Sequence, residues 1–171
     1  MGKKTAVTID RMRKEDLVQV VAIEGEAFSA PWSRNLFLSE FRDPAISLAL
    51  VAIARGSIRE INGYIVSWVT ADELHILNLA TQRQYRQKGI AKELVVTALR
   101  QAFQRGARRA FLEVRASNDP ALRMYRNFGF VTTAVRKDYY DLPIEDAVVM
   151  TLEKDEYIRL INAPQGEDAV E

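Results

Sequence analysis

The sequence predicts an α/β fold of the α+β kind, with a mixed and mostly antiparallel sheet of about seven strands and flanking helices. Strand-like runs follow one another directly before residue 82 and again after residue 130, which favours antiparallel neighbours. Between these groups, one helical pattern separates two strand-like runs, as in a β-α-β crossover. A length of 171 residues suits one domain with its own core.

The first half of the chain alternates strand and helix patterns in a simple order. Val7 and Ile9 alternate with polar residues, as in a half-buried strand, and Ser33 is a suitable helix N-cap. Turn signals at Arg55-Gly56 and Asn62-Gly63 separate two runs rich in aliphatic residues, which predicts an antiparallel hairpin. The expected elements are a strand at 5–12, helices at 14–28 and 33–41, and strands at 47–54, 61–69 and 73–81.

The second half begins with the best-defined helix. Its apolar residues recur from Ile90 to Phe103 at helical spacing, and Gly106 ends it. Asn118 is a natural N-cap for a short helix that Gly129 closes. The other expected elements are strands at 109–115, 131–136 and 147–152, so that residues 5–153 form the domain, followed by a C-terminal tail at 154–171 whose last residues, 164–171, are acidic.

The loop before this long helix has the character of an anion site. The start of a helix carries unpaired backbone N–H groups and a partial positive charge. Four cations lie within ten residues here, at Arg83, Arg86, Lys88 and Lys92, with no carboxylate before Glu93. The pattern predicts a phosphate site, although a basic solvated loop that caps a helix would show much of the same pattern.

The bulk composition excludes several classes of protein. The net charge of +1 provides no global field for nucleic acid or for an anionic membrane. The absence of cysteine excludes disulfides, thiolate metal sites and cysteine nucleophiles, and we expect no metal site. The N-terminus has no apolar core of a signal peptide, and no apolar run approaches the roughly 18 residues of a membrane span. We therefore expect a cytoplasmic protein. A monomer or a weak homodimer is expected as well.

Four segments occur in an order and spacing that resemble the GNAT superfamily of acyl-CoA N-acyltransferases, over roughly residues 5–153. They are Ile76–Ala80 (ILNLA), Arg86–Ala91 (RQKGIA), Leu112–Arg115 (LEVR) and Asn118–Phe130 (NDPALRMYRNFGF). Within the superfamily, three stretches resemble the RimI-type ribosomal-protein alanine N-acetyltransferases, namely 30–33 (APWS), 112–118 (LEVRASN) and 136–140 (RKDYY). Ala91 departs from the glycine of many members, but its methyl group is small.

The resemblance implies a GNAT fold with acetyl-CoA as cosubstrate. Its pantetheine would lie in a V-shaped split between the strands ending near Ala80 and Val114, bonded to a strand edge as an added strand would be. A backbone N–H at the strand kink, that of Leu79 or a neighbour, would contact the thioester oxygen. The implied coenzyme residues are Leu79, Ala80, Thr81, Arg86, Gln87, Lys88, Gly89, Ile90, Ala91, Lys92 and Asn118.

Acetyl transfer to an amine needs a base for the amine and an acid for the departing thiolate. An α-amine, with a reference pKa of about 7.7 to 8.0, needs only a modest base. By resemblance Glu113 is that base and Tyr125 the acid. The structural alternatives are that Glu113 faces solvent or pairs with Arg115, and that Tyr125 is core. Asn118 would hold the pantetheine arm, cap its helix, or do both.

Several other residues leave two readings open. Glu24 lies on the apolar stripe of the first helix, and we expect a salt-bridged structural residue rather than a contact of the substrate ammonium. His75, the only histidine, is expected to be an ordinary side chain on the face of a strand. Trp32, Tyr139 and Tyr140 belong to segments that flank the acceptor groove in relatives, so they are expected either to bind a peptide or to pack in the core.

Three functions follow from these residues. The leading hypothesis is acetylation of a protein N-terminus, that of ribosomal protein S18 with its alanine. The second is acetylation of a small amine such as a polyamine, amino sugar or amino acid, which would favour an acidic groove. The aromatic segments at Trp32 and Tyr139-Tyr140 favour the peptide. The third is an acyl-CoA-binding regulatory module, against which the presence of both Glu113 and Tyr125 argues.

Overall fold

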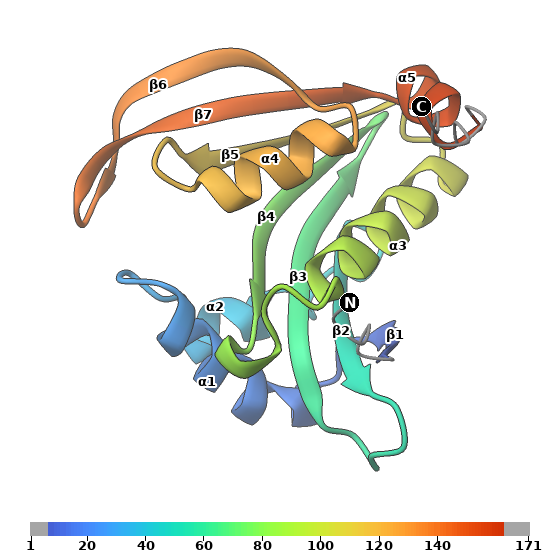
Figure 1. Ribbon diagram of the computed structural model, residues 1–171. Coiled ribbons are helices and arrows are strands. Elements are labelled where there is room, and N and C mark those ends of the chain that lie inside the picture. The colour runs from blue at the N-terminus through green and yellow to red at the C-terminus, as the bar shows by residue number, and fades with distance from the viewer. Residues whose placement is uncertain (1–6, 163–171) are drawn as a thin grey trace, which may run out of the picture.

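Within residues 7–162, the chain forms a seven-stranded sheet in the order β1-β2-β3-β4-β5-β7-β6, in which only the β4–β5 pair is parallel. The computed structural model describes residues 7–162 (Figure 1). The mixed, mostly antiparallel sheet and the central crossover confirm the expected fold class. The strands are β1 Val7–Arg11, β2 Ser47–Ala54, β3 Ile61–Thr70, β4 Glu73–Thr81, β5 Arg109–Arg115, β6 Val131–Asp141 and β7 Ile144–Glu153.

Helices cover both faces of this sheet. The Ser33 side chain accepts a hydrogen bond from the Leu36 N–H and so begins α2, as a serine N-cap does. No helix within residues 7–162 is both long and apolar enough to cross a membrane. The helices are α1 Leu17–Ala27, α2 Arg34–Ser39, α3 Ile90–Gln104, α4 Asp119–Asn127 and α5 Lys154–Asn162, with 3₁₀ turns η1 Lys14–Asp16 and η2 Arg83–Tyr85.

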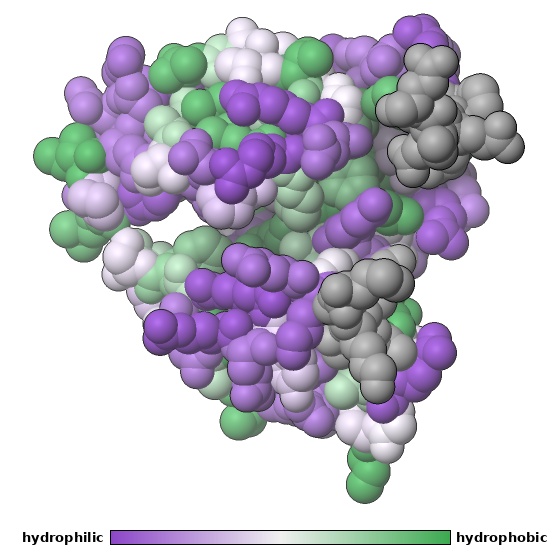
Figure 2. All heavy atoms as spheres, in the orientation of Figure 1, coloured by the Kyte–Doolittle hydropathy of each residue, from purple (hydrophilic) through white to green (hydrophobic). Residues whose placement is uncertain are grey.

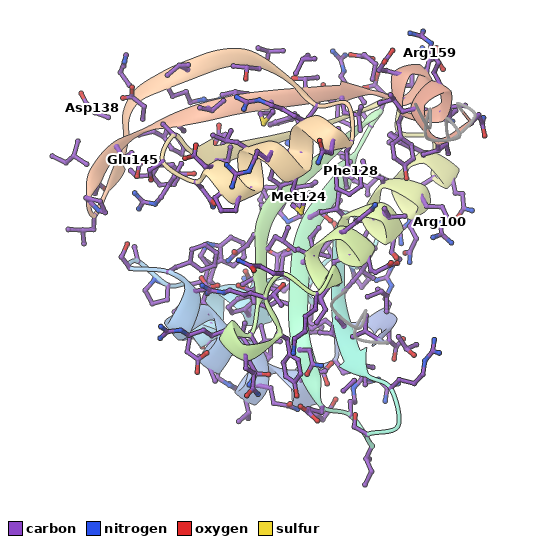
Figure 3. The ribbon with its side chains drawn as sticks, viewed as in Figure 1. Arg100, Met124, Phe128, Asp138, Glu145 and Arg159 are labelled. Atoms are coloured by element: carbon purple, nitrogen blue, oxygen red, sulfur yellow. The ribbon has the colours of Figure 1, made fainter. Side chains whose placement is uncertain are left out.

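Two hydrophobic cores hold the layers together. The larger core joins α3 and α4 to one face of the sheet, where Met124 points from α4 toward α3 (Figure 3). The smaller core lies on the opposite face and joins α1 and α2 to β2 and β3 through Leu17, Phe37 and Tyr64. Alternate residues of a strand point to opposite faces, so the central strands supply both cores and are buried almost throughout.

The expected turn at Asn62-Gly63 is wrong, because both residues lie inside β3. A bulge between Ala52 and Ile53 of β2 accommodates Asn62. Gly63 is needed for a close approach rather than for a turn. A Cβ atom there would lie 2.9 Å from the carbonyl oxygen of Ala80 and 3.2 Å from the Ile90 side chain.

The C-terminal part of the chain contains more structure than its pattern indicates. β6 and β7 extend beyond the expected 131–136 and 147–152 and form a long hairpin. The expected tail from residue 154 begins instead with α5, whose Tyr157 is buried with its ring centroid 5.7 Å from that of Phe103. The acidic stretch 164–171 lies outside the described residues.

Candidate active site

The parallel strands β4 and β5 separate into a fork. The two strands are paired only where Glu73–Ile76 of β4 lies beside Arg109–Leu112 of β5. Directly beyond the last pair, Leu77 is an extra residue in β4, since Val66 and Ser67 of β3 face Asn78 and Ile76. Such a bulge bends a strand. The fork confirms the V-shaped split, and it contains a pocket of about 690 Å³ that is visible as the hollow between two lobes in Figure 2.

The pocket collects residues from both halves of the chain. Its walls are formed by the α1–α2 connection, by β4 and β5 beyond the fork, by the start of α4 and by the β6–β7 hairpin. Six of the residues expected in the site line it, namely Trp32, Leu79, Glu113, Asn118, Tyr125 and Tyr140. The remaining expected coenzyme residues, from Ala80 to Lys92, follow along the end of β4 and the start of α3, outside this pocket.

Glu113 lies on the β5 arm of the fork with a side chain 21% exposed. Its Oε1 lies 3.0 Å from Nε of Arg136, so its partner is not Arg115. A hydrogen bond with Glu113 also raises the pKa of the Tyr139 hydroxyl. Tyr139 therefore contacts the candidate base from the hairpin without lining the pocket itself. The carboxylate is anchored by two side chains of β6 while one side of it faces the pocket.

Tyr125 is 5% exposed and lies on α4, at the pocket wall. Its ring packs edge-on against Phe130 with the centroids 5.5 Å apart. Burial, and to a smaller extent the nearby Tyr140, raises the pKa of the Tyr125 hydroxyl above its ordinary value. A phenol in this position keeps its proton at neutral pH and is able to donate it.

Asn118 caps α4, since its Oδ1 accepts a hydrogen bond from the Ala121 N–H at 3.3 Å. The same side chain lines the pocket, so the two roles expected for it are compatible in space. Tyr140 of the hairpin also lines the pocket. Its burial, together with the charge of Glu113, raises the pKa of its hydroxyl to about 12.

Arg115 holds the β6–β7 hairpin over the pocket, a role that sequence reasoning missed. Its guanidinium donates to Glu145 at 3.1 Å and to the carbonyl oxygens of Leu142 and Pro143 at 2.9 and 3.2 Å. It also lies 4.1 Å from the centroid of the Tyr140 ring. The only signal in the sequence was a charged residue at the end of an apolar strand.

A hydrogen bond closes the pocket on the side of the α1–α2 connection. The Ser29 hydroxyl donates to the carbonyl oxygen of Leu142 at 2.5 Å and so bridges the two lobes. Glu145 fastens the other side, where it accepts from the Ser117 N–H at 2.6 Å near the start of α4 (Figure 3). The pocket is thus bounded by protein at the hairpin and is not an open groove there.

Glu24 is not salt-bridged, contrary to expectation. No basic side chain within residues 7–162 forms an ion pair with it, and it accepts hydrogen bonds from neutral groups only. One donor is the backbone N–H of Trp32, at 2.7 Å. Another donor is the side-chain amide of Asn78. Asn78 is a polar residue within the apolar run of β4, and this was the one feature of the sequence that pointed to a polar contact there. His75 lies outside the pocket, 3.0 Å from Glu73 and packed on Phe111.

The loop from Gln82 to Gly89 leads into the start of α3. Gln87 and Gly89 both have left-handed backbone, with φ of 60° and 83°. Gly89 is the N-cap, and in the described chain no side chain bonds to the helix start there. Consecutive N–H groups in such a conformation form a concave anion site. The geometry therefore fits a diphosphate, in agreement with the charge pattern of the loop.

Comparison with known proteins gives consistent matches over most of the chain. The acetyltransferase (GNAT) family model matches residues 17–130. A Bacillus subtilis protein, described as "Putative [ribosomal protein bS18]-alanine N-acetyltransferase", is 34% identical over 147 residues, which cover 86% of this chain and 95% of that protein.

Two solved structures are similar in both fold and sequence. The ribosomal-protein-S18-alanine N-acetyltransferase of Escherichia coli superimposes with a TM-score of 0.78 and 29% identity, covering 86% of this chain and 94% of that one. Ard1 from Thermoplasma volcanium superimposes with a TM-score of 0.77 and 27% identity, covering 86% and 97%.

Proposed function

The chain belongs to the acetyltransferase (GNAT) family and uses acetyl-CoA, and we propose that its acceptor is the N-terminal alanine of ribosomal protein bS18. The observation that carries the proposal is the pocket at the fork of β4 and β5, which places Glu113 and Tyr125 in one cavity. The names of the most similar relatives support the acceptor. The reaction would take place in the cytoplasm, where ribosomes are assembled.

The coenzyme would be held by the end of β4 and the start of α3. The N–H groups from Gln87 to Lys92 would bind the diphosphate, and Arg86 and Lys88 would add charge. Beyond Ile76 the edge of β4 is not paired with β5, so a backbone N–H of the Leu77–Leu79 segment that points away from β3 would bond the pantetheine or the thioester oxygen. The coenzyme supplies the acetyl thioester.

Each candidate side chain has one task in the reaction. Glu113 takes a proton from the acceptor's ammonium group, directly or through water, and leaves a neutral amine. The amine nitrogen forms a bond to the carbonyl carbon and loses its second proton to solvent, while the carbon–sulfur bond breaks. Tyr125 donates its proton to the departing sulfur. The products are the acetylated N-terminus and CoA, and solvent restores the protons of the two side chains.

Gly89→Val should raise the Kd for acetyl-CoA at least about tenfold, because the new side chain lies where the diphosphate approaches the N–H groups. Calorimetry on the purified variant measures this change. Gly56→Val is the matched control, since Gly56 has a φ of 87° and lies in the β2–β3 turn with open space around it. Both variants carry similar backbone strain, but only Gly89→Val should lose affinity. Equal affinities in the two folded variants would exclude this loop as the diphosphate site.

The acceptor proposal predicts that alanine-first peptides from the bS18 N-terminus exceed internal-lysine peptides and spermidine at least about tenfold in kcat/KM, or about 1.4 kcal/mol. A free chain end brings backbone contacts beyond its first residue, whereas a lysine amine has a higher pKa and lacks them. Turnover with labelled acetyl-CoA across such a panel measures the ratio. Preference for spermidine would identify a small-amine enzyme, and coenzyme binding without any acceptor would indicate a regulatory module.

A further inference from the structure

Glu24 is a buried carboxylate in the wall of the active-site pocket, and it is only 1% exposed. Trp32 donates its backbone N–H to Oε1, Tyr64 donates its hydroxyl to Oε2, and the Asn78 amide nitrogen lies 3.2 Å from both oxygens. All of these partners are donors, which suits a carboxylate that only accepts. Within residues 7–162 no cation neutralises it. Its charge therefore acts on the pocket.

The other buried carboxylates of the described chain serve different purposes. Asp16, also 1% exposed, is paired with Arg59 at 2.7 Å. Glu40 is 8% exposed and accepts from Ser47 and Trp68, away from the pocket. A buried charge is costly unless it is paired, hydrogen-bonded or given a cation. Of the three, Glu24 alone lies where a ligand could bring that cation.

Asn78 extends the influence of Glu24 into the pocket. Both carboxylate oxygens only accept hydrogen bonds, so the atom of the Asn78 amide that faces Glu24 must be the donor Nδ2 and not Oδ1. The amide oxygen then points away from Glu24, and no donor within residues 7–162 bonds to it. Asn78 lines the pocket. The arrangement leaves one acceptor, backed by a negative charge, on the pocket side.

The position of Asn78 relative to the fork is the second argument. Ile76 and Leu112 form the last pair between β4 and β5. Asn78 follows Ile76 by two residues on one arm, and Glu113 follows Leu112 directly on the other. A group bound at Asn78 therefore sits across the fork from the candidate base, where the acceptor amine must be placed.

We propose that Asn78 and Glu24 form the recognition site for the acceptor's ammonium group, an inference that rests on the proposed function. Asn78 Oδ1 accepts a hydrogen bond from the ammonium. Glu24 is a positioning residue that fixes the Asn78 amide and supplies the opposite charge. Glu113, which lies on the other arm of the fork, then removes a proton from the bound ammonium group. The two carboxylates of the pocket therefore have separate tasks.

Glu24→Gln tests this assignment with two peptides that differ only in the amine. One is the alanine-first bS18 peptide, and the other carries a propionyl group in place of alanine, so that its shape is kept and its amine is absent. Calorimetry in the presence of CoA gives both affinities without turnover. We expect wild-type protein to prefer the amine at least about tenfold, and Glu24→Gln and Asn78→Ala to reduce this preference to less than about threefold.

The matched control is Glu40→Gln, which removes a buried carboxylate outside the pocket and should retain the full preference. Asn78→Ala leaves the Glu24 carboxylate in place and removes the acceptor on the pocket side, so it decides the question if Glu24→Gln does not fold. Equal weakening of both peptides in Glu24→Gln, or full preference for the amine in Asn78→Ala, would overturn the inference. Failure of the proposed function is a separate result, namely a wild-type enzyme that acetylates no N-terminal peptide.

Discussion

Glu113→Gln should lower kcat for peptide acetylation about 10²- to 10⁴-fold near neutral pH, while the affinity for acetyl-CoA is retained. The substitution keeps the shape of the side chain next to Arg136, but an amide does not take a proton from the amine. An α-amine with a reference pKa of about 7.7 to 8.0 arrives mostly protonated at pH 7. The loss should therefore be largest below that pKa and smaller above it. Steady-state rates from pH 6 to 9 measure the effect.

Arg136→Gln is the control for Glu113, because it breaks the 3.0 Å ion pair and leaves the carboxylate in place. Arg136 is 54% exposed, and exposed ion pairs contribute little to stability, so the protein should fold normally. Its kcat should fall far less than that of Glu113→Gln. Wild-type turnover of Glu113→Gln at neutral pH would remove Glu113 from the mechanism.

Tyr125→Phe should lower kcat by a similar factor, about 10²- to 10⁴-fold, because it removes only the hydroxyl that protonates the departing sulfur. The ring contact with Phe130 remains, so the melting temperature should change little. Since burial raises the pKa of the Tyr125 hydroxyl, the wild-type rate should show no loss from phenol ionisation below about pH 10. Rates and thermal unfolding on the same samples separate the chemical from the structural effect.

Tyr157→Phe is the matched control for Tyr125. Tyr157 is also buried on a helix and packs against an aromatic ring, that of Phe103, but it lies outside the pocket. Its replacement should leave kcat unchanged. If Tyr125→Phe retains near-wild-type turnover, Tyr125 is a core residue only.

Local pattern predicted most of the secondary structure. The bounds of β2, β4 and β5 agree with the expected 47–54, 73–81 and 109–115, because aliphatic runs bounded by turn residues depend on neighbours in the chain. The Asn62-Gly63 error has a tertiary cause. Gly63 is required by the approach of Ala80 and Ile90, residues far along the chain, and not by a local turn.

The sequence by itself determined the order of elements, the central crossover, the basic loop at the start of α3 and the candidate pair Glu113 and Tyr125. The order of elements, the crossover and the loop follow from short-range periodicity and helix-end chemistry, and the candidate pair follows from the resemblance to the GNAT family. Only the tertiary structure decided where β4 and β5 separate, that Arg136 rather than Arg115 pairs with Glu113, and that Glu24 has no cation within the described chain. Each of these depends on strand register and on contacts between residues distant in sequence, which local pattern does not encode.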